Sequence, residues 1–202
     1  MKFIPACISL LLLLSCKENS RKLPILGQPL VNGKDTVYPV VADFRLTDQD
    51  SAVVTNQTFG NKIYVADFIF LSCPTICPKM TREMYKAYLP FATDERVMFL
   101  SHTIDPRRDT IPRLKAYANN LGVSARKWHF VTGAEDSIYA LSEKSYYSAA
   151  YPDSSAPGGF THSGGLLLVD KNRHIRGVYD GTNPQETERL IADIGLLLKE
   201  SF

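Results

Sequence analysis

Two cysteines spaced four residues apart are the side chains of this chain best placed to do chemistry. Cys73 and Cys77 lie in the run Cys-Pro-Thr-Ile-Cys-Pro. If this segment is helical or tightly looped, both sulfurs lie on one side, where they can share a metal ion or form a disulfide. Pro78 favours a helix start, which places Cys77 where unpaired backbone amides lower the pKa of a thiol. The pair therefore predicts metal binding or redox chemistry.

A metal ion held by two sulfurs needs a further ligand from elsewhere in the fold. His162 ends a loop that contains Gly158 and Gly159 and lies directly before an apolar strand pattern. The other histidines are expected to be structural or solvated, because they lie in strand patterns or in a turn (His102, His129 and His174). Two thiolates and one imidazole form a soft ligand set that suits monovalent copper. We therefore expect His162 and the two cysteines to bind one copper ion.

Alternating strand and helix patterns must position these residues. Residues 63–71 are almost wholly apolar, which predicts a central strand buried on both faces, and a helix follows the cysteines as far as Pro90. Further strands are expected at 96–104, 128–131, 165–170 and 175–179, helices at 110–121, 134–143 and 184–200, and a β-hairpin from 40–46 and 52–55. The pattern predicts an α/β fold with a mixed central sheet flanked by helices and an N-terminal β-hairpin.

The first residues have the pattern of an export signal. A basic start, an apolar stretch too short to cross a bilayer and the run Leu-Leu-Ser-Cys ending at Cys16 resemble a bacterial lipoprotein signal. An ordinary secretory signal is the alternative. We expect a signal peptide at 1–15, a lipid on Cys16, a tether at 16–36 and one domain at 37–202. The protein is then exported to the bacterial cell envelope, with its domain in the periplasm.

The charge balance gives little support to binding nucleic acid. The chain has 23 Lys and Arg against 21 Asp and Glu, and a formal net charge of +2. Such a balance produces no field that would attract a polyanion. We expect a monomer that associates with the membrane through its lipid.

Four motifs together are similar to the Sco (SenC) family of copper chaperones, thioredoxin-like proteins tethered to the respiratory membrane. They are the Cys-Pro-x-x-Cys-Pro run at 73–78, Thr-Ile-Asp-Pro-Arg-Arg-Asp-Thr at 103–110, Trp-x-Phe-x-Thr-Gly at 128–133, and a histidine before a Leu-Leu-Leu-Val-Asp strand. The resemblance implies that Cys73, Cys77 and His162 are copper ligands and that Asp105 is the acidic residue near the metal. It also implies a recipient, the CuA centre in a subunit II-like part of cytochrome c oxidase.

The residues around Asp105 also suggest roles for it without the family resemblance. A carboxylate after a strand end can orient a metal site, or it can start a turn before Pro106. The three residues that follow Pro106 are expected to form a solvated helix start, and two methionines of the first helix are expected to pack in the core (Arg107, Arg108 and Asp109; Met80 and Met84).

Asp67 raises an alternative function. Its carboxyl lies in an apolar strand, where burial raises a pKa, and it resembles the buried aspartate of thioredoxins. A thiol-disulfide reductase that keeps the cysteines of a recipient reduced is therefore the second hypothesis, and an enzyme activity stays open in this form only. Against it, three residues separate Cys73 from Cys77, where thioredoxins have two, and no proline lies between 160 and 170. A copper or redox sensor is a third hypothesis, but no signalling surface marks it.

Overall fold

The computed structural model describes residues 22–202. The predicted signal peptide and Cys16 therefore lie outside the described residues. Within residues 22–202, none of the helices combines the length and the apolarity that crossing a membrane requires.

A seven-stranded mixed sheet lies at the centre of the fold, in the order β11-β10-β5-β6-β7-β3-β4. The strands β5, β6 and β7 run parallel, and the other neighbours are antiparallel. Every residue of β5 and β6 is buried, because helices cover both faces of the sheet. The strands are β3 (Arg45–Asp48), β4 (Val53–Thr55), β5 (Ile63–Ile69), β6 (Val97–Thr103), β7 (Trp128–Thr132), β10 (Gly165–Val169) and β11 (Ile175–Asp180).

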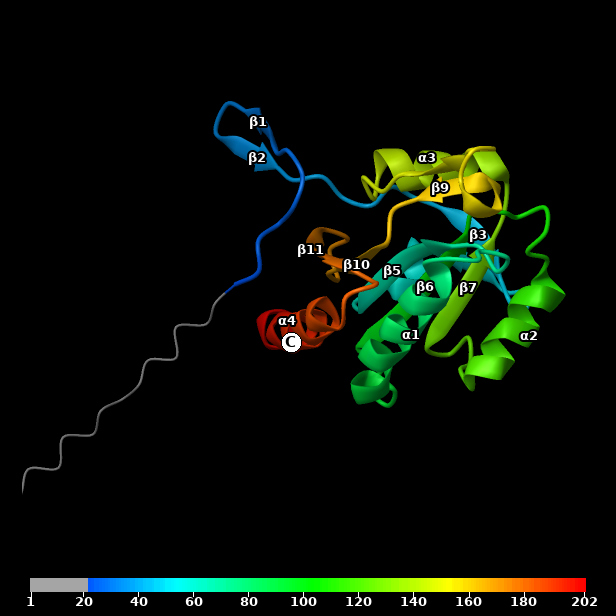
Figure 1. Cartoon of the computed structure of the whole chain (residues 1–202). Helices are drawn as coiled ribbons and strands as arrows, with labels where there is room; N and C mark the ends of the chain where they lie inside the picture. Colours follow the sequence, from blue (N-terminus) through cyan, green and yellow to red (C-terminus); the bar gives the residue numbers. More distant parts are fainter. Residues whose placement is uncertain (1–21) are drawn as a thin grey trace, which may run out of the picture.

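Four α-helices cover the two faces of this sheet. They are α1 (Cys77–Tyr88), α2 (Ile111–Leu121), α3 (Glu135–Lys144) and α4 (Pro184–Ser201). Figure 1 shows α1, α2 and α4 on one face and α3 on the other. On the first face the Tyr117 hydroxyl of α2 donates to Thr81 Oγ1 of α1, at 2.8 Å, and Thr187 Oγ1 of α4 donates to Glu83 Oε2 of α1, at 2.9 Å. The expected sheet covered by helices on both faces is confirmed.

The N-terminal hairpin is shorter than predicted. It consists of β3 and β4, so residues 40–44, which are apolar except for Asp43, belong to no strand. The carboxylate of Asp48 closes its turn by accepting hydrogen bonds from the amides of Asp50 and Ala52, each at 2.9 Å. Before β3, the side chain of Asn56 accepts from the Phe44 amide and donates to the Ala42 carbonyl, so side-chain hydrogen bonds take the place of strand pairing there.

A second, small hairpin forms in the segment expected to be a tether. It pairs β1 (Leu30–Asn32) with β2 (Asp35–Val37), and all of its residues are exposed. Figure 1 shows it standing apart from the central sheet.

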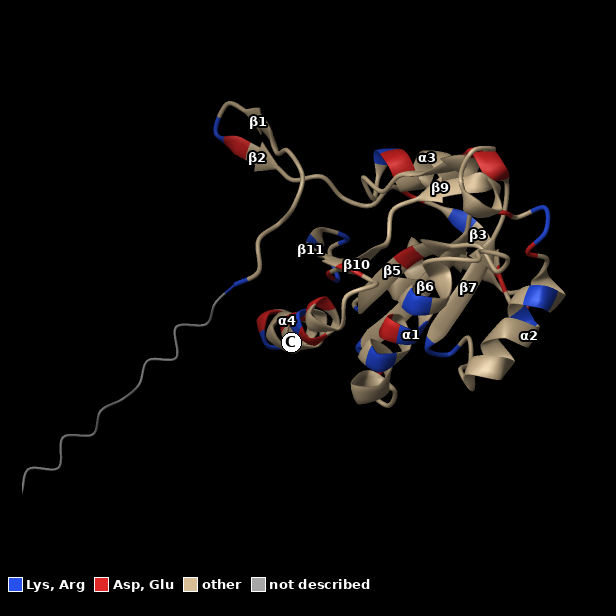
Figure 2. Ribbon diagram, viewed as in Figure 1, with Lys and Arg blue, Asp and Glu red and all other residues tan. Residues whose placement is uncertain are grey.

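Charged residues of both signs are intermixed over the surface helices. Figure 2 shows acidic and basic residues side by side on α1 and α4. The opposite face of α1 is apolar, and its Met80 and Met84 have no exposed surface. The two methionines therefore pack in the core, as expected.

Candidate metal centre

The structure brings Cys73, Cys77 and His162 together, although 89 residues separate the first from the last. The Nε2 atom of His162 lies 3.3 Å from Cys77 Sγ and 3.9 Å from Cys73 Sγ. The three ligand atoms all lie within 4.8 Å of one another. Both thiols are free and nearly buried, with 7% and 5% of the residue exposed, and the histidine is half-buried. This is a Cys-Cys-His group that can hold a metal ion.

The end of β5 and the start of α1 place the two sulfurs. The amide of Cys73 donates to the carbonyl of Phe70, at 3.1 Å, which turns the chain sharply after the strand. Cys77 is the first residue of α1, and Pro78, whose missing N–H costs nothing at this position, follows it. A turn and a helix start thus bring the two side chains to the same side of the segment.

His162 reaches the cysteines from a separate pair of strands. It ends β9 (Phe160–His162), which pairs with β8 (Ala150–Pro152), and neither strand is among those that the sequence predicted. The ring of Phe70 meets the imidazole edge to face, with centroids 5.6 Å apart. Among residues 22–202 the Nδ1 atom of His162 has no hydrogen-bond partner, so packing against Phe70 and the contacts of Nε2 with the two sulfurs orient the ring.

The two thiols differ in acidity, and not in the way the sequence predicted. Burial raises the pKa of Cys73, but hydrogen bonds from the Cys77 amide, from His162 and from the Thr75 amide outweigh it and lower this pKa to about 6. Burial raises the pKa of Cys77 far above its usual range, and the neighbouring Cys73 sulfur raises it further. The expectation that the helix N-terminus acidifies Cys77 is therefore wrong, because desolvation of this thiol is the stronger effect. Cys73 is therefore the more acidic of the two thiols.

Gly158 allows the loop that carries His162 to pack on the cysteine segment. It lies in η3 (Pro157–Gly159) with a φ of 82°, and a Cβ atom there would come within 2.9 Å of two ring carbons of Phe70 and within 3.2 Å of Pro74 Cδ. Gly159 has a similar φ of 87°, but a Cβ atom there would meet nothing within 4 Å. Only the first position requires glycine for packing.

We therefore expect Gly158→Ala to move the His162 loop away from the cysteines. Copper affinity should fall about tenfold, because a soft ligand that is displaced by about 1 Å binds poorly. The matched control is Gly159→Ala, which introduces the same backbone strain without the clash and should bind copper nearly as the parent does. Equal affinities of the two variants in a competition titration would show that the close packing at Gly158 does not matter.

The two carboxylates that the sequence singled out are not part of the three-residue group. Asp67 is buried in β5, neither carboxylate oxygen has a hydrogen-bond partner within residues 22–202, and burial raises its pKa to about 7. Asp105 is also buried, and its carboxylate accepts from Arg108, through the amide at 3.4 Å and through the guanidinium at 3.3 Å. The turn at Asp105 and Pro106, one of the two interpretations that the sequence left open, therefore forms.

Asp109 differs from its expectation. The sequence placed it in a solvated helix start with Arg107 and Arg108, and both arginine side chains are indeed exposed. Asp109 is instead fully buried, because its carboxylate turns inward to the amide of Leu71 and the hydroxyl of Thr103. The sequence does not predict this buried position, because an acidic residue beside two arginines is equally typical of a surface turn.

The remaining histidines lie outside the metal group. His102 is fully buried with its ring stacked on Phe68, at 4.6 Å between centroids. His129 is buried and its Nδ1 lies 2.9 Å from Asp48 Oδ2, so both histidines are structural. The side chain of His174 is 20% exposed, so it is more buried than the solvated turn residue that the sequence suggested.

Comparisons with known proteins agree with this geometry. A family model described as SCO1/SenC matches residues 32–199. A SCO1 protein homolog from Bacillus subtilis is 28% identical over 163 residues, which cover 80% of this chain and 84% of that protein. A SCO1/SenC family lipoprotein from Bacillus anthracis has a similar structure, with a TM-score of 0.72 and 27% identity over 86% of this chain and 99% of that one.

A more distant structure shares the fold. ScoI from Arabidopsis thaliana, solved with copper bound, has a TM-score of 0.64 and 21% identity, and the match covers 77% of this chain and 98% of that one. At this identity the likeness shows the fold alone. The family model, in contrast, spans most of the sequence and includes all three residues of the metal group. The chain therefore belongs to the SCO1/SenC family.

Proposed function

We propose that the protein binds one copper ion through Cys73, Cys77 and His162 and delivers it to a respiratory copper enzyme. The observation that carries this proposal is the convergence of two sulfurs and one imidazole nitrogen within 4.8 Å. Thiolate and imidazole together favour copper over the hard cations that prefer oxygen. The Arabidopsis relative of similar fold has been solved with copper bound, which supports the same cargo here.

The surroundings of the group suggest how the copper ion leaves. A cavity of about 190 Å³ opens onto Cys73 and His162, and its other walls are Thr75, Ile76, Ala156, Pro157, Phe160 and Thr161. An incoming donor would reach the metal from this side. It would displace His162 first, because the short β8–β9 pair holds this ligand and can move at low cost. The buried Cys77 would release the ion last.

The proposed recipient is the CuA centre of cytochrome c oxidase, which the family resemblance implies. We also propose that a lipid on Cys16 anchors the domain at the membrane, in the periplasm, and that the protein acts as a monomer. A lipoprotein among the structural relatives supports the anchor. A delivery protein that is held near the membrane meets a membrane-bound recipient at a raised effective concentration.

Metal analysis followed by transfer tests this function. The purified chain should bind one equivalent of Cu(I). Mixing two equivalents of the loaded chain with a copper-free CuA domain should move both copper ions into that domain, and removal of one electron by ferricyanide should then give the absorption bands of the CuA centre. A Cys73→Ser, Cys77→Ser variant is the control and should transfer nothing. A parent chain that binds no copper, or that keeps it in the presence of the recipient, would contradict the proposal.

A thiol-disulfide reductase that keeps the recipient's cysteines reduced is the second candidate. Two observations favour it: the low pKa of Cys73, which gives a reactive thiolate, and the buried carboxyl of Asp67, whose pKa of about 7 suits proton exchange. The same two cysteines serve both candidates. His162 would be a metal ligand only in the copper function, and in the reductase it would act only through its hydrogen bond to the Cys73 sulfur.

A further inference from the structure

The two residues before Cys73 are held by side chains from a distant part of the chain. Leu71 and Ser72 follow Phe70 in the segment that connects the end of β5 to Cys73. The amide of Leu71 donates to the carboxylate of Asp109 (Oδ2), at 3.0 Å and 38 residues away. A carboxylate thus supplies the acceptor that a neighbouring strand would otherwise supply.

Asp109 is itself rigidly placed. It is fully buried, its amide donates to the carbonyl of Asp105 at 2.8 Å, and Oδ2 also accepts from the Thr103 hydroxyl at 2.6 Å. Its second oxygen, Oδ1, makes no hydrogen bond within residues 22–202 and lies 3.5 Å from the guanidinium of Arg113, in an ion pair. A buried carboxylate is stable only when such partners compensate for lost hydration, so its position is strongly determined.

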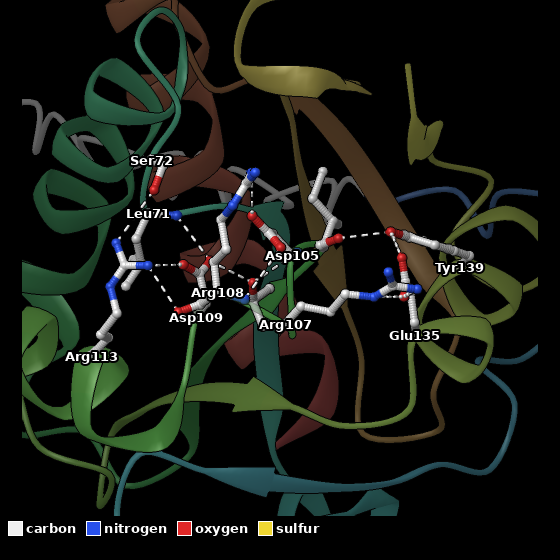
Figure 3. A network of polar contacts seen from close by, with 11 residues as sticks. Leu71, Ser72, Asp105, Arg107, Arg108, Asp109, Arg113, Glu135 and Tyr139 are labelled. Atoms are coloured by element: carbon white, nitrogen blue, oxygen red, sulfur yellow. Dashed lines mark hydrogen bonds and ion pairs between the residues drawn. The ribbon is translucent and has the colours of Figure 1, made fainter. Parts of the chain in front are cut away.

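Arg113 completes the connection. Its Nη1 donates to the carbonyl of Arg108 at 2.8 Å, and its Nη2 donates to Ser72 Oγ at 3.3 Å. Figure 3 shows this side chain lying between Asp109 and Ser72, with Leu71 beside them. One carboxylate and one guanidinium therefore each hold one of the two residues that lead to the sulfur.

We propose that Asp109 and Arg113 are positioning residues for Cys73, which fix the direction from which its sulfur meets Cys77 and His162. The expected effect on copper binding rests on the proposed copper function. The position of the Cys73 sulfur also decides how easily the two cysteines form a disulfide, whether or not copper binds. Both properties are sensitive to small shifts, because disulfides and metal complexes tolerate narrow ranges of geometry. Removing the hydrogen bonds to Leu71 and Ser72 therefore impairs both the metal geometry and the disulfide geometry.

Variants of the whole chain test this role through two independent measurements. Asp109→Ala and Arg113→Met should each shift the thiol-disulfide equilibrium against glutathione, by about tenfold for Asp109→Ala, and change the thiolate-to-copper charge-transfer absorption of the Cu(II) complex. Asp109→Asn should restore part of both, because its amide oxygen still accepts from Leu71. The matched control is Arg107→Met, which breaks an ion pair with Glu135 in the same network but touches neither Leu71 nor Ser72.

The outcomes separate positioning from general stability. If Asp109→Ala does not fold, Arg113→Met and Ser72→Ala decide the question, because their side chains lie at the surface or in the loop. If these variants have the same thiol-disulfide equilibrium and the same Cu(II) spectrum as the parent, the proposal is overturned. It is also overturned if Arg107→Met changes both measurements as much as they do. A parent chain that binds no copper would contradict the proposed function and leave the disulfide measurement as a valid test of positioning.

Discussion

Replacing His162 with alanine should lower the affinity of the reduced chain for Cu(I) by about 100-fold or more. The side chain supplies one of three donor atoms, and loss of even the outer partners of metal ligands lowers affinity about 10- to 100-fold. Disulfide formation should persist, because both sulfurs stay in place. Competition with a Cu(I) chelator measures the first effect, and thiol titration after mild oxidation measures the second.

The control for this variant is His174→Ala, which removes a histidine outside the metal group. It should bind copper as the parent does. A His162→Ala chain that titrates with copper like the parent would remove this histidine from the site. The protein would then be a dithiol protein and not a metallochaperone.

The second large effect concerns stability and pH. Burial raises the pKa of Asp67 from 3.8 to about 7 in the folded chain, whereas the unfolded chain retains the ordinary value. Between about pH 4 and about pH 7 the unfolded chain therefore loses its proton while the folded chain keeps it, so stability falls as pH rises. The shift corresponds to roughly 4 kcal/mol of the free energy of unfolding, lost over this range and constant above it.

Asp67→Asn isolates this contribution, because the amide does not titrate. The free energy of unfolding of the variant minus that of the parent should increase with pH across the same range, in the copper-free, reduced chain. His102 acts in the opposite direction, since burial lowers its pKa to about 4, but it is present in both proteins and cancels in the difference. A difference for Asp67→Asn that stays flat with pH would mean that this carboxyl is not desolvated.

The same Asp67→Asn chain distinguishes the two candidate functions. Loss of disulfide reductase activity with unchanged copper binding would favour the reductase. Unchanged reductase activity would remove the proton-exchange role of Asp67 and leave copper delivery as the better account.

The central part of the fold was predictable because apolar residues follow one another there almost without interruption. An apolar run over 63–71 leaves few alternatives to a buried strand, and a proline beside a cysteine marks the start of α1. The β8–β9 pair was not predictable, because its strands are three residues long and lie in a polar region with a strained glycine loop. Strands this short depend on packing against Phe70 and not on their own sequence.

The sequence predicts which residue types form the candidate site, but it does not predict the pKa values of the two thiols. The preference for a soft metal follows from two cysteines and one histidine. Which thiol ionises depends on desolvation and on three specific hydrogen bonds, which no spacing rule contains. The inward turn of Asp109 depends on the tertiary position of Leu71 in the same way.

The placement of the donor atoms on two segments far apart in sequence has a consequence for proteolysis. A bound ion would cross-link Cys73 and Cys77 to His162 at the end of β9, and so close a loop between positions that are 89 and 85 apart in sequence. A ligand that binds only the closed state lowers the population of opened chains by the factor 1 + [L]/Kd. The loaded protein should then resist cleavage around residues 150–162, so a brief digestion would report whether the cargo has been released.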